Sequence, residues 1–376
     1  MNYWGAIICG LLGMGIVVLV IPLVLRAGQA GNLFQGRHDL HHTHRQAVPR
    51  SGGLALAAAF VGFTMALAVF SPEESTADND WMVAVVSSLA MFALGFWDDL
   101  KPLRASRKLT VQILIALSVC ACGIGITHFR IPFVGTDISL GGWGVLITVA
   151  WLVGIANLIN RIDGVDGLAG GICLMLMTLL AYVAHGSGAF GLMATAMAGA
   201  LLGFLWFNFP PARIYLGDGG AYFLGFQIGL LAIPSSQKGT LVAALVAPLF
   251  VLALPIVDTA LAILRRGLRG LPIFRPDRRH LHHHLLRSGM SRRRVVLSFY
   301  GVTLIFLAMG FMAYWSRGDL VPVLLGGATL ILLVCAGRLR FSRNWFDVAR
   351  VVGSYLKMRQ QIHYALALTS WLTLEG

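Results

Sequence analysis

Acidic and amide side chains gather at three places in a chain that is otherwise strongly apolar. Only 12% of the residues are charged, yet Asp98 and Asp99 are adjacent, NLINRIDGVDG occupies 157–167, and Asp218 lies in LGDGGA. Ionisable groups near a hydrocarbon layer are costly, so they normally face the interior of a helix bundle or water. These residues therefore indicate a site, and their types indicate its chemistry.

Asp98 and Asp99 form the first of these groups, and Lys101, Arg104 and Lys108 follow closely. A solvated cluster of charges at a helix end explains such a pattern about as well as a functional site does. The functional interpretation is that neighbouring carboxylates share a divalent cation or a proton, because two like charges ionise together only at a cost. The pair alone leaves both interpretations open.

The second group places polar residues at three-residue intervals. Asn157 and Asn160 are neighbours on one face of a helix, whereas continuing the same step to Asp163 and Asp166 rotates away from that face. The glycines of DGVDG predict that the helix loosens, so that both carboxylates turn into a common pocket at the membrane surface. Packing hydrogen bonds between helices explain the Asn pair but explain DGVDG poorly.

Asp218 stands in a glycine-rich segment between two apolar runs. The glycines permit close approach of a phosphate to the backbone, and free N–H groups at the start of the next helix favour an anion. An ordinary turn has the same sequence, so the motif is weak by itself. Its position beside the other acidic groups strengthens the functional interpretation.

Histidines and arginines are concentrated in RPDRRHLHHH (275–284), where Arg279, His280, His282 and His283 are the candidate site residues. Histidines at this spacing can bind zinc. However, the neighbouring arginines repel a cation and attract a phosphate or pyrophosphate. A simple positive anchor on the inner side of a membrane explains the arginines but not the histidines, so the segment is predicted to bind phosphate.

Together these groups have the parts that phosphoryl transfer requires. Carboxylates can hold Mg²⁺, glycine turns can admit phosphates, and a basic segment can neutralise a pyrophosphate. The apolar surroundings suit a lipid carrier. The sequence therefore predicts chemistry on a phosphorylated substrate bound to a membrane.

The elements that position these residues are predicted to be membrane helices. The chain has 376 residues, 57% of them apolar, and uncharged runs of roughly 18 residues or more are candidate spans. Long runs of this kind, with HGSG at 185–188 dividing one of them, predict an all-α, polytopic membrane protein with about eleven spans. The runs are 4–25, 51–72, 81–97, 109–129, 138–160, two within 167–212, 219–237, 239–257, 295–316 and 320–337.

The distribution of basic residues predicts the orientation of these spans. Loops on one side contain 26 of the 29 Lys and Arg residues, which places the N-terminus outside, the C-terminus inside and the acidic motifs at the cytoplasmic face. The net charge of +13 then reflects membrane orientation and affinity for anionic lipid or phosphate. No nucleic-acid-binding signature accompanies the charge, so no nucleic-acid partner is expected.

The ordered motifs resemble those of the polyprenyl-phosphate N-acetylhexosamine-1-phosphate transferases. The resemblance covers about 37–286, and any one motif is weak, whereas six in order are specific. They are HRQAVPRSGGLA (44–55), GFWDDLKPLRASRKLTVQ (95–112), VGIANLINRIDGVDGLAGG (153–171), NFPPARIYLGDGGAYFLGF (208–226), LPIVDTALAILRR (254–266) and PDRRHLHHHLL (276–286).

The resemblance implies a reaction and its cofactor. Undecaprenyl phosphate attacks the β-phosphate of a UDP-N-acetylhexosamine, such as UDP-GlcNAc, which gives a lipid-pyrophosphoryl sugar and UMP. Mg²⁺ is the implied cofactor, with Mn²⁺ as the alternative. The implied location is the bacterial cytoplasmic (inner) membrane, where the reaction starts a cell-envelope polysaccharide such as a lipopolysaccharide O-antigen or a teichoic acid. A homodimer is also suggested.

The resemblance also implies roles for individual residues. It makes Asp218 the main Mg²⁺ ligand and Asn160 a second. Asp98 and Asp99 orient or deprotonate the lipid phosphate, and Lys108 contacts a phosphate. Asp163, Asp166 and Asn157 line the nucleotide side, while His280, His282 and His283 engage the pyrophosphate or sugar. Asp98, Asp99 and Asp163 are thus the catalytic candidates.

The chain departs from the family pattern at two places. Lys101 and Pro102 stand where many members have a third acid, and Ala221 replaces the small hydroxyl residue of the usual GDxGS. The basic segment resembles the cell-envelope polysaccharide and teichoic-acid initiators more than the enzyme that uses a UDP-muramoyl-pentapeptide. The sequence does not identify the sugar.

The predicted organisation is a membrane-embedded catalytic domain at 1–337 and a cytoplasmic tail at 338–376. The tail contains RLRFSRNWFDVARVV, which is typical of an amphipathic helix at the inner membrane surface or of a disordered tail. An ion-coupled transporter is the alternative function, since acids near helix breaks also occur there. Transporters keep such acids near the bilayer midplane, whereas these cluster at helix ends.

Overall fold

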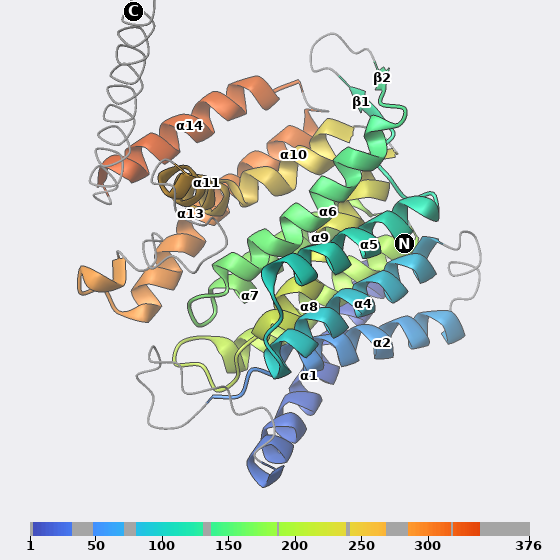
Figure 1. The fold of residues 1–376 in the computed structure, drawn as a ribbon, viewed down its shortest axis with the longest axis vertical. Helices are drawn as coiled ribbons and strands as arrows, with labels where there is room; N and C mark the ends of the chain where they lie inside the picture. Colours follow the sequence, from blue (N-terminus) through green and yellow to red (C-terminus); the bar gives the residue numbers. More distant parts are fainter. Residues whose placement is uncertain are drawn as a thin grey trace, which may run out of the picture.

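The fold, seen in a computed structural model, is a bundle of apolar helices (Figure 1). The structure describes residues 3–31, 48–70, 80–130, 137–185, 188–237, 241–267, 285–316 and 319–338. The helices are α1 (Tyr3–Gly31), α2 (Gly52–Phe70), α4 (Asp80–Leu100), α5 (Ala105–Ala121), α6 (Trp143–Ile162), α7 (Leu168–Val183), α8 (Ala189–Asn208), α9 (Gly217–Gln237), α10 (Leu241–Val251), α11 (Ala253–Gly267), α13 (Arg292–Trp315) and α14 (Val321–Arg338).

Six helices within the described residues are long and apolar enough to cross a membrane, namely α1, α2, α4, α6, α8 and α13. Their outward faces carry many exposed large apolar side chains, such as Leu19, Phe70 and Trp206, which only a lipid environment makes favourable. The prediction of a polytopic helical membrane protein is therefore confirmed. The number of eleven spans and their orientation stay predictions.

Two predicted spans are wrong at their ends, because a β-hairpin lies between them. Strands β1 (His128–Arg130) and β2 (Asp137–Ser139) pair antiparallel, with Phe129 opposite Ile138. The chain is thus mainly helical rather than all-α, and α5 ends at Ala121, well before the predicted limit of 129. Hydropathy misses this boundary because a short apolar run is equally compatible with a strand.

The predicted span 239–257 is divided between α10 and α11. Pro255 lies in the first turn of α11 and has no N–H with which to continue the helical hydrogen bonds of α10. Proline is tolerated in a first turn, so a second helix begins here rather than the first one extending. The predicted division at 185–188 is confirmed, since α7 and α8 lie on either side of it.

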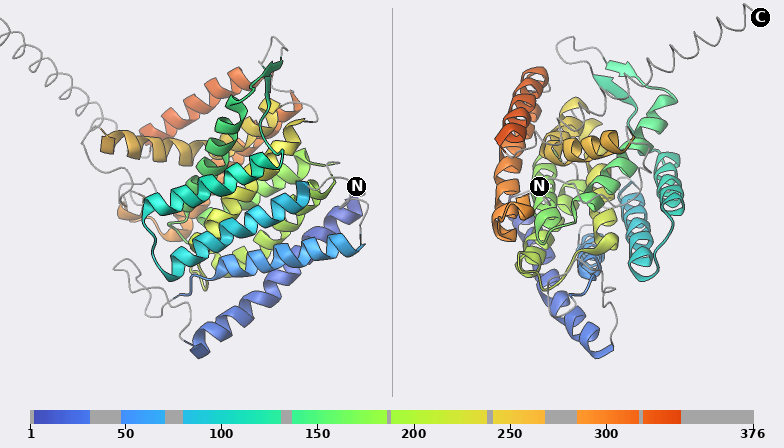
Figure 2. Two further views of the ribbon diagram at one scale, coloured as in Figure 1. Left: turned by 45° about the vertical axis from the view of Figure 1, so that its right-hand side comes forward. Right: turned by 60° about the vertical axis from the view of Figure 1, so that its left-hand side comes forward.

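Helix α9 is the central element of the bundle. It contacts α2, α4, α6, α7, α8 and α10, and Figures 1 and 2 show these helices grouped around it. From Gly217 to Ile233 every residue of α9 is buried except Asp218, which is half-buried. A helix that is apolar on all sides is expected inside a bundle, so α9 fixes the position of Asp218 firmly.

Glycines bring α1 and α8 into backbone contact. A Cβ atom at Gly13 would overlap the carbonyl oxygen of Ala196, and one at Gly199 would overlap that of Gly10. Helices in a membrane gain association energy mainly from such close packing, which small residues permit. The contact attaches the N-terminal helix to the core of the bundle.

This contact predicts a difference between two glycines of α1. Gly13→Ala should lower the thermal stability of the detergent-solubilised protein, because overpacking against rigid backbone costs roughly 1–3 kcal/mol. Gly15→Ala is the matched control, since a Cβ atom there meets nothing within 4 Å and alanine favours the helix. Equal melting temperatures for the two variants would contradict the proposed packing.

Candidate functional site

The adjacent aspartates at the end of α4 make separate contacts, and Asp99 binds the start of α9. Its Oδ1 accepts a hydrogen bond from the backbone N–H of Asp218 at 3.0 Å, and its Oδ2 accepts one from Gly219 at 2.9 Å. A carboxylate at a helix N-terminus satisfies unpaired amides and interacts favourably with the helix dipole. Asp99 therefore anchors the helix that carries Asp218.

This arrangement corrects the prediction for the LGDGGA segment. The amides of Asp218 and Gly219 are not free to bind a substrate phosphate in this structure, because they donate to Asp99. The glycines serve helix packing instead. A Cβ atom at Gly219 would lie 3.0 Å from the backbone nitrogen of Phe96, and one at Gly220 would lie 2.8 Å from the Cα of Gly53.

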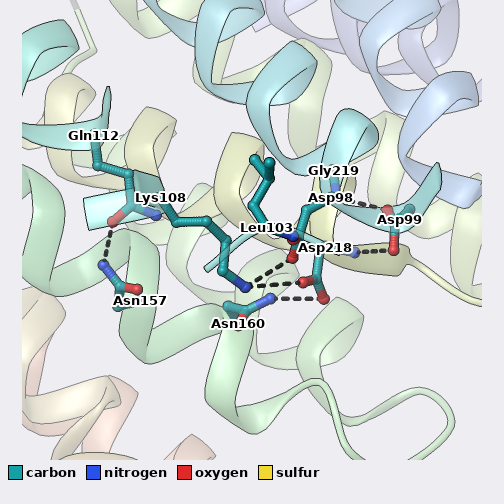
Figure 3. Close-up of polar contacts among 9 residues, drawn as sticks. All are labelled: Asp98, Asp99, Leu103, Lys108, Gln112, Asn157, Asn160, Asp218 and Gly219. Carbon is teal, nitrogen blue, oxygen red and sulfur yellow. Dashed lines mark hydrogen bonds and ion pairs between the residues drawn. The ribbon is translucent and has the colours of Figure 1, made fainter. Parts of the chain in front are cut away.

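Asp98 is buried and holds the side chain of Lys108 (Figure 3). Its Oδ2 lies 2.7 Å from the Lys108 Nζ atom, and its Oδ1 accepts a hydrogen bond of 2.7 Å from the backbone N–H of Leu103. Lys108 also forms a longer ion pair of 3.9 Å with the Asp218 Oδ2 atom. Lys108 thus joins the end of α4 to the start of α9.

The two asparagines of α6 lie on one helix face, as predicted, and point to different partners. Asn160 donates from Nδ2 to the Asp218 Oδ1 atom at 3.1 Å. Asn157 donates from Nδ2 to Gln112 Oε1 at 2.7 Å and to the carbonyl of Val153 at 2.8 Å. Figure 3 shows one polar cluster to which α4, α5, α6 and α9 each contribute a side chain: Asp98, Lys108, Asn160 and Asp218.

The DGVDG segment forms the turn between α6 and α7, as predicted. Helix α6 ends at Ile162, and Gly167 precedes α7 with a left-handed φ of 79° that a glycine adopts without strain. Its amide donates to Asn208 Oδ1 at 2.9 Å. Both carboxylates of the segment line a cavity of about 150 Å³. The full lining is Arg50, Asp99, Asp163, Gly164, Val165, Asp166, Asn208, Tyr215, Gly217 and Asp218.

Arg50 and Tyr215 line the cavity but were not predicted from the sequence as site residues, although they lie within the motifs at 44–55 and 208–226. Backbone hydrogen bonds join their segments: Tyr215 donates to the carbonyl of Pro49, and Gly52 donates to that of Tyr215. This pairing brings Arg50 to the cavity. Arginine is abundant on this side of the chain, so its type gave no signal. For Tyr215, the only indication in the sequence was its place in the loop between two predicted spans, close to Asp218.

Asp163 has the most perturbed electrostatic environment outside the membrane-spanning helices. Burial, together with the negative charges of Asp218 and Asp99, raises the pKa of the Asp163 carboxyl to about 8. In the metal-free protein this carboxyl therefore keeps its proton near neutral pH. A buried carboxyl with a raised pKa is a candidate functional group that could bind a cation or act as a proton donor.

The donor atoms fit a hard divalent cation that is also bound by substrate. The cluster offers carboxylate and amide oxygens, which Mg²⁺ prefers. Among the described residues, no three His, Cys, Asp or Glu side chains converge as a complete metal cage. Mg²⁺ usually takes one or two carboxylates, several waters and substrate phosphates. Asp218 is suited to hold it, with Asn160 beside it.

The structure thus brings together the predicted residues on α4, α5 and α9, Asn160 of α6, and the carboxylates of the turn after α6. The predicted place of Asn157 on the nucleotide side is wrong, because Asn157 bonds Gln112 and does not line the cavity. The cluster and the cavity share Asp218, and Asp99, which also lines the cavity, binds the Asp218 amide. Arg279, His280, His282 and His283 lie outside the described residues, as do 339–376 of the predicted tail. Their predicted roles stay predictions.

The raised pKa of Asp163 predicts how stability depends on pH. Because the folded state retains a proton that the unfolded state loses above about pH 4, stability should fall from there to about pH 8 in the metal-free protein. Asp163→Asn removes this contribution, so its melting temperature should exceed that of wild type by a few degrees near pH 8. Melting curves in EDTA between pH 5 and 8 provide the measurement. A difference independent of pH would contradict it.

Comparisons with known proteins identify the family of the chain. Residues 81–236 match the model of glycosyl transferase family 4. A probable undecaprenyl-phosphate N-acetylglucosaminyl 1-phosphate transferase of Bacillus subtilis is 34% identical over 77% of this chain and 80% of its own length. A decaprenyl-phosphate N-acetylglucosaminephosphotransferase of Mycobacterium tuberculosis is 32% identical over 84% and 86%.

A more distant relation also covers most of the chain. A phospho-N-acetylmuramoyl-pentapeptide-transferase of Clostridium botulinum is 30% identical over 72% of this chain and 84% of its own length. The alternative of an ion-coupled transporter is not favoured by these matches. The chain belongs to glycosyl transferase family 4, among the membrane-embedded polyprenyl-phosphate N-acetylhexosamine-1-phosphate transferases whose motifs it resembles.

Proposed function

We propose that the protein transfers an N-acetylhexosamine 1-phosphate, with GlcNAc as the first candidate sugar, from a UDP-sugar to undecaprenyl phosphate. An oxygen of the lipid phosphate attacks the β-phosphorus of the donor, and a new P–O–P bond forms. The bond between the β-phosphorus and the bridging oxygen breaks, and UMP leaves with that oxygen. The product is undecaprenyl-pyrophosphoryl sugar in the bacterial cytoplasmic membrane, where it starts a cell-envelope polysaccharide.

One observation carries the proposal: Asp218 lies at the border between a polar cluster and a cavity. On one side are Lys108 and Asn160, at the ends of helices with lipid-facing surfaces. On the other are Asp163 and Asp166, which line the cavity. A residue between the two sides is placed to act where a lipid phosphate and a nucleotide donor meet.

Each side chain can then be given a role from its contacts. Lys108, held by Asp98, supplies positive charge for a phosphate that enters from the lipid side. Asp99 has both oxygens engaged by α9 and positions Asp218 rather than attacking the substrate. Mg²⁺ bound by Asp218 and Asn160 would neutralise the charge that develops on the transferred phosphate. The cavity beside Asp163 and Asp166 would hold the nucleotide.

A turnover assay tests the proposal directly. Purified protein with Mg²⁺ and undecaprenyl phosphate should release UMP from radiolabelled UDP-GlcNAc or another UDP-N-acetylhexosamine, and EDTA should abolish release because the phosphates then lose their counter-charge. A panel of UDP-sugars in the same assay identifies the donor. Failure to turn over any of them, in protein that melts cooperatively, would reject the proposal.

A substitution that removes the charge but keeps the shape of the side chain tests the proposed metal ligand. Asp218→Asn keeps the shape of the side chain but removes its charge, and turnover should fall by more than about a hundredfold, since even indirect ligand contacts are worth about 10- to 100-fold. Asp319→Asn, at an exposed position just before α14, is the control and should leave turnover unchanged. Near-normal turnover by Asp218→Asn would remove this residue from the site.

A further inference from the structure

The first turn of α13 contacts the cavity through Arg292. Its Nη1 atom lies 3.2 Å from the Oδ2 atom of Asp166, and its side chain also hydrogen-bonds Tyr215. Asp166 and Tyr215 both line the cavity. The Asp166 side chain is 7% exposed and that of Arg292 is 32% exposed, so the pair is shielded on the carboxylate side and open on the guanidinium side.

Helix α13 is held in place by contacts that do not involve Arg292. The Nε atom of Arg293 donates to the carbonyl of Pro210 at 2.7 Å, and the hydroxyl of Tyr300 donates to the carbonyl of Gly167 at 2.5 Å. The Tyr300 ring also packs against Gly171, where no side chain would fit. Loss of Arg292 should therefore leave α13 docked and affect only the wall of the cavity.

The contacts of Asp166 leave one of its oxygens available. Oδ2 accepts from the Ala212 amide at 3.3 Å and from Arg292, whereas Oδ1 has no hydrogen bond from the described residues. A planar guanidinium can bind a carboxylate and a phenol at the same time, which the single ammonium of a lysine does less well. Arg292 thus fixes two cavity groups with one side chain.

We propose that Arg292 is a positioning residue of the donor site. It holds the Asp166 carboxylate and the Tyr215 ring in a fixed arrangement on one wall of the cavity, and so raises the affinity for the nucleotide of the donor. The inference rests on the proposed function for the identity of that nucleotide. Lys108 and Asn160, the residues of the lipid side, do not line the cavity, so binding of the lipid acceptor should not depend on Arg292.

Nucleotide binding provides the first test. UDP binding to the purified full-length protein in detergent with Mg²⁺ should weaken roughly ten- to hundredfold in Arg292→Gln, which is the cost of a charge-assisted hydrogen-bond network. Arg292→Lys keeps the charge and should fall between this variant and wild type. Arg294→Gln is the matched control: it removes an equal charge from an exposed position in the same turn and should change UDP affinity by less than about twofold.

A double-mutant cycle with Asp166→Asn separates positioning from general electrostatics. If Arg292 acts through Asp166, Arg292→Gln combined with Asp166→Asn should bind UDP about as weakly as the weaker single variant. Independent action would give additive losses and overturn the inference. In turnover, the KM for the UDP-sugar should rise in Arg292→Gln while the KM for undecaprenyl phosphate stays within about twofold.

The other possible results distinguish a failure of the proposed role of Arg292 from a failure of the proposed function. Equal loss of donor and lipid affinity, an equal effect of Arg294→Gln, or a wild-type protein that binds no UDP would overturn the role of Arg292. A wild-type protein that binds UDP but transfers no sugar phosphate would reject the proposed function alone. In that case weaker UDP binding by Arg292→Gln would still support Arg292 as a positioning residue of a nucleotide site.

Discussion

The cost of burying negative charge controls the construction of this site. Five aspartates lie close together at the ends of apolar helices, where an uncompensated carboxylate is strongly unfavourable. Each of three has a specific partner: Lys108 for Asp98, the amides at the start of α9 for Asp99, and Arg292 for Asp166. These partners come from three different helices, α5, α9 and α13, so the carboxylates can be accommodated only once the bundle has assembled.

The packing of helix α9 fixes the position of Asp218 within this group of aspartates. Its apolar surface packs against six other helices, and its glycines permit backbone contact with α4 and α2 near its start. Asp218 is the one half-buried residue between Gly217 and Ile233. The packing of the helix that carries it therefore holds Asp218 in place, which a flexible loop would not do. A rigid element is what a site needs if it is to hold charged groups at a set distance.

The sequence predicted those members of the cluster whose residue type is energetically unfavourable in apolar surroundings. Asp163 and Asp218 stood out because a carboxylate is expensive in an apolar chain, and the turn at Gly164 and Gly167 followed from glycine's freedom. The same reasoning failed for Gly219 and Gly220, since a glycine that admits a phosphate and one that admits a helix look identical. It also missed Arg292, because one arginine among many on the basic side has no distinguishing spacing. The hairpin at 128–139 was missed because hydropathy does not separate a strand from the end of a helix.

The pattern of partners also supports the proposal of a cation beside Asp218. Once the three compensated aspartates are set aside, Asp163 has no hydrogen bond or ion pair within the described part of the chain. Asp218 contacts the neutral amide of Asn160, the side chain of Asp98 and, at 3.9 Å, Lys108. Asp163 and Asp218 are thus the two carboxyl groups without a close cationic partner, and both border the same cavity. Two phosphates could not approach such a place unless positive charge came with them. A divalent cation that is bound jointly by Asp218 and the substrate removes both difficulties, and the protein then needs to supply only part of the coordination.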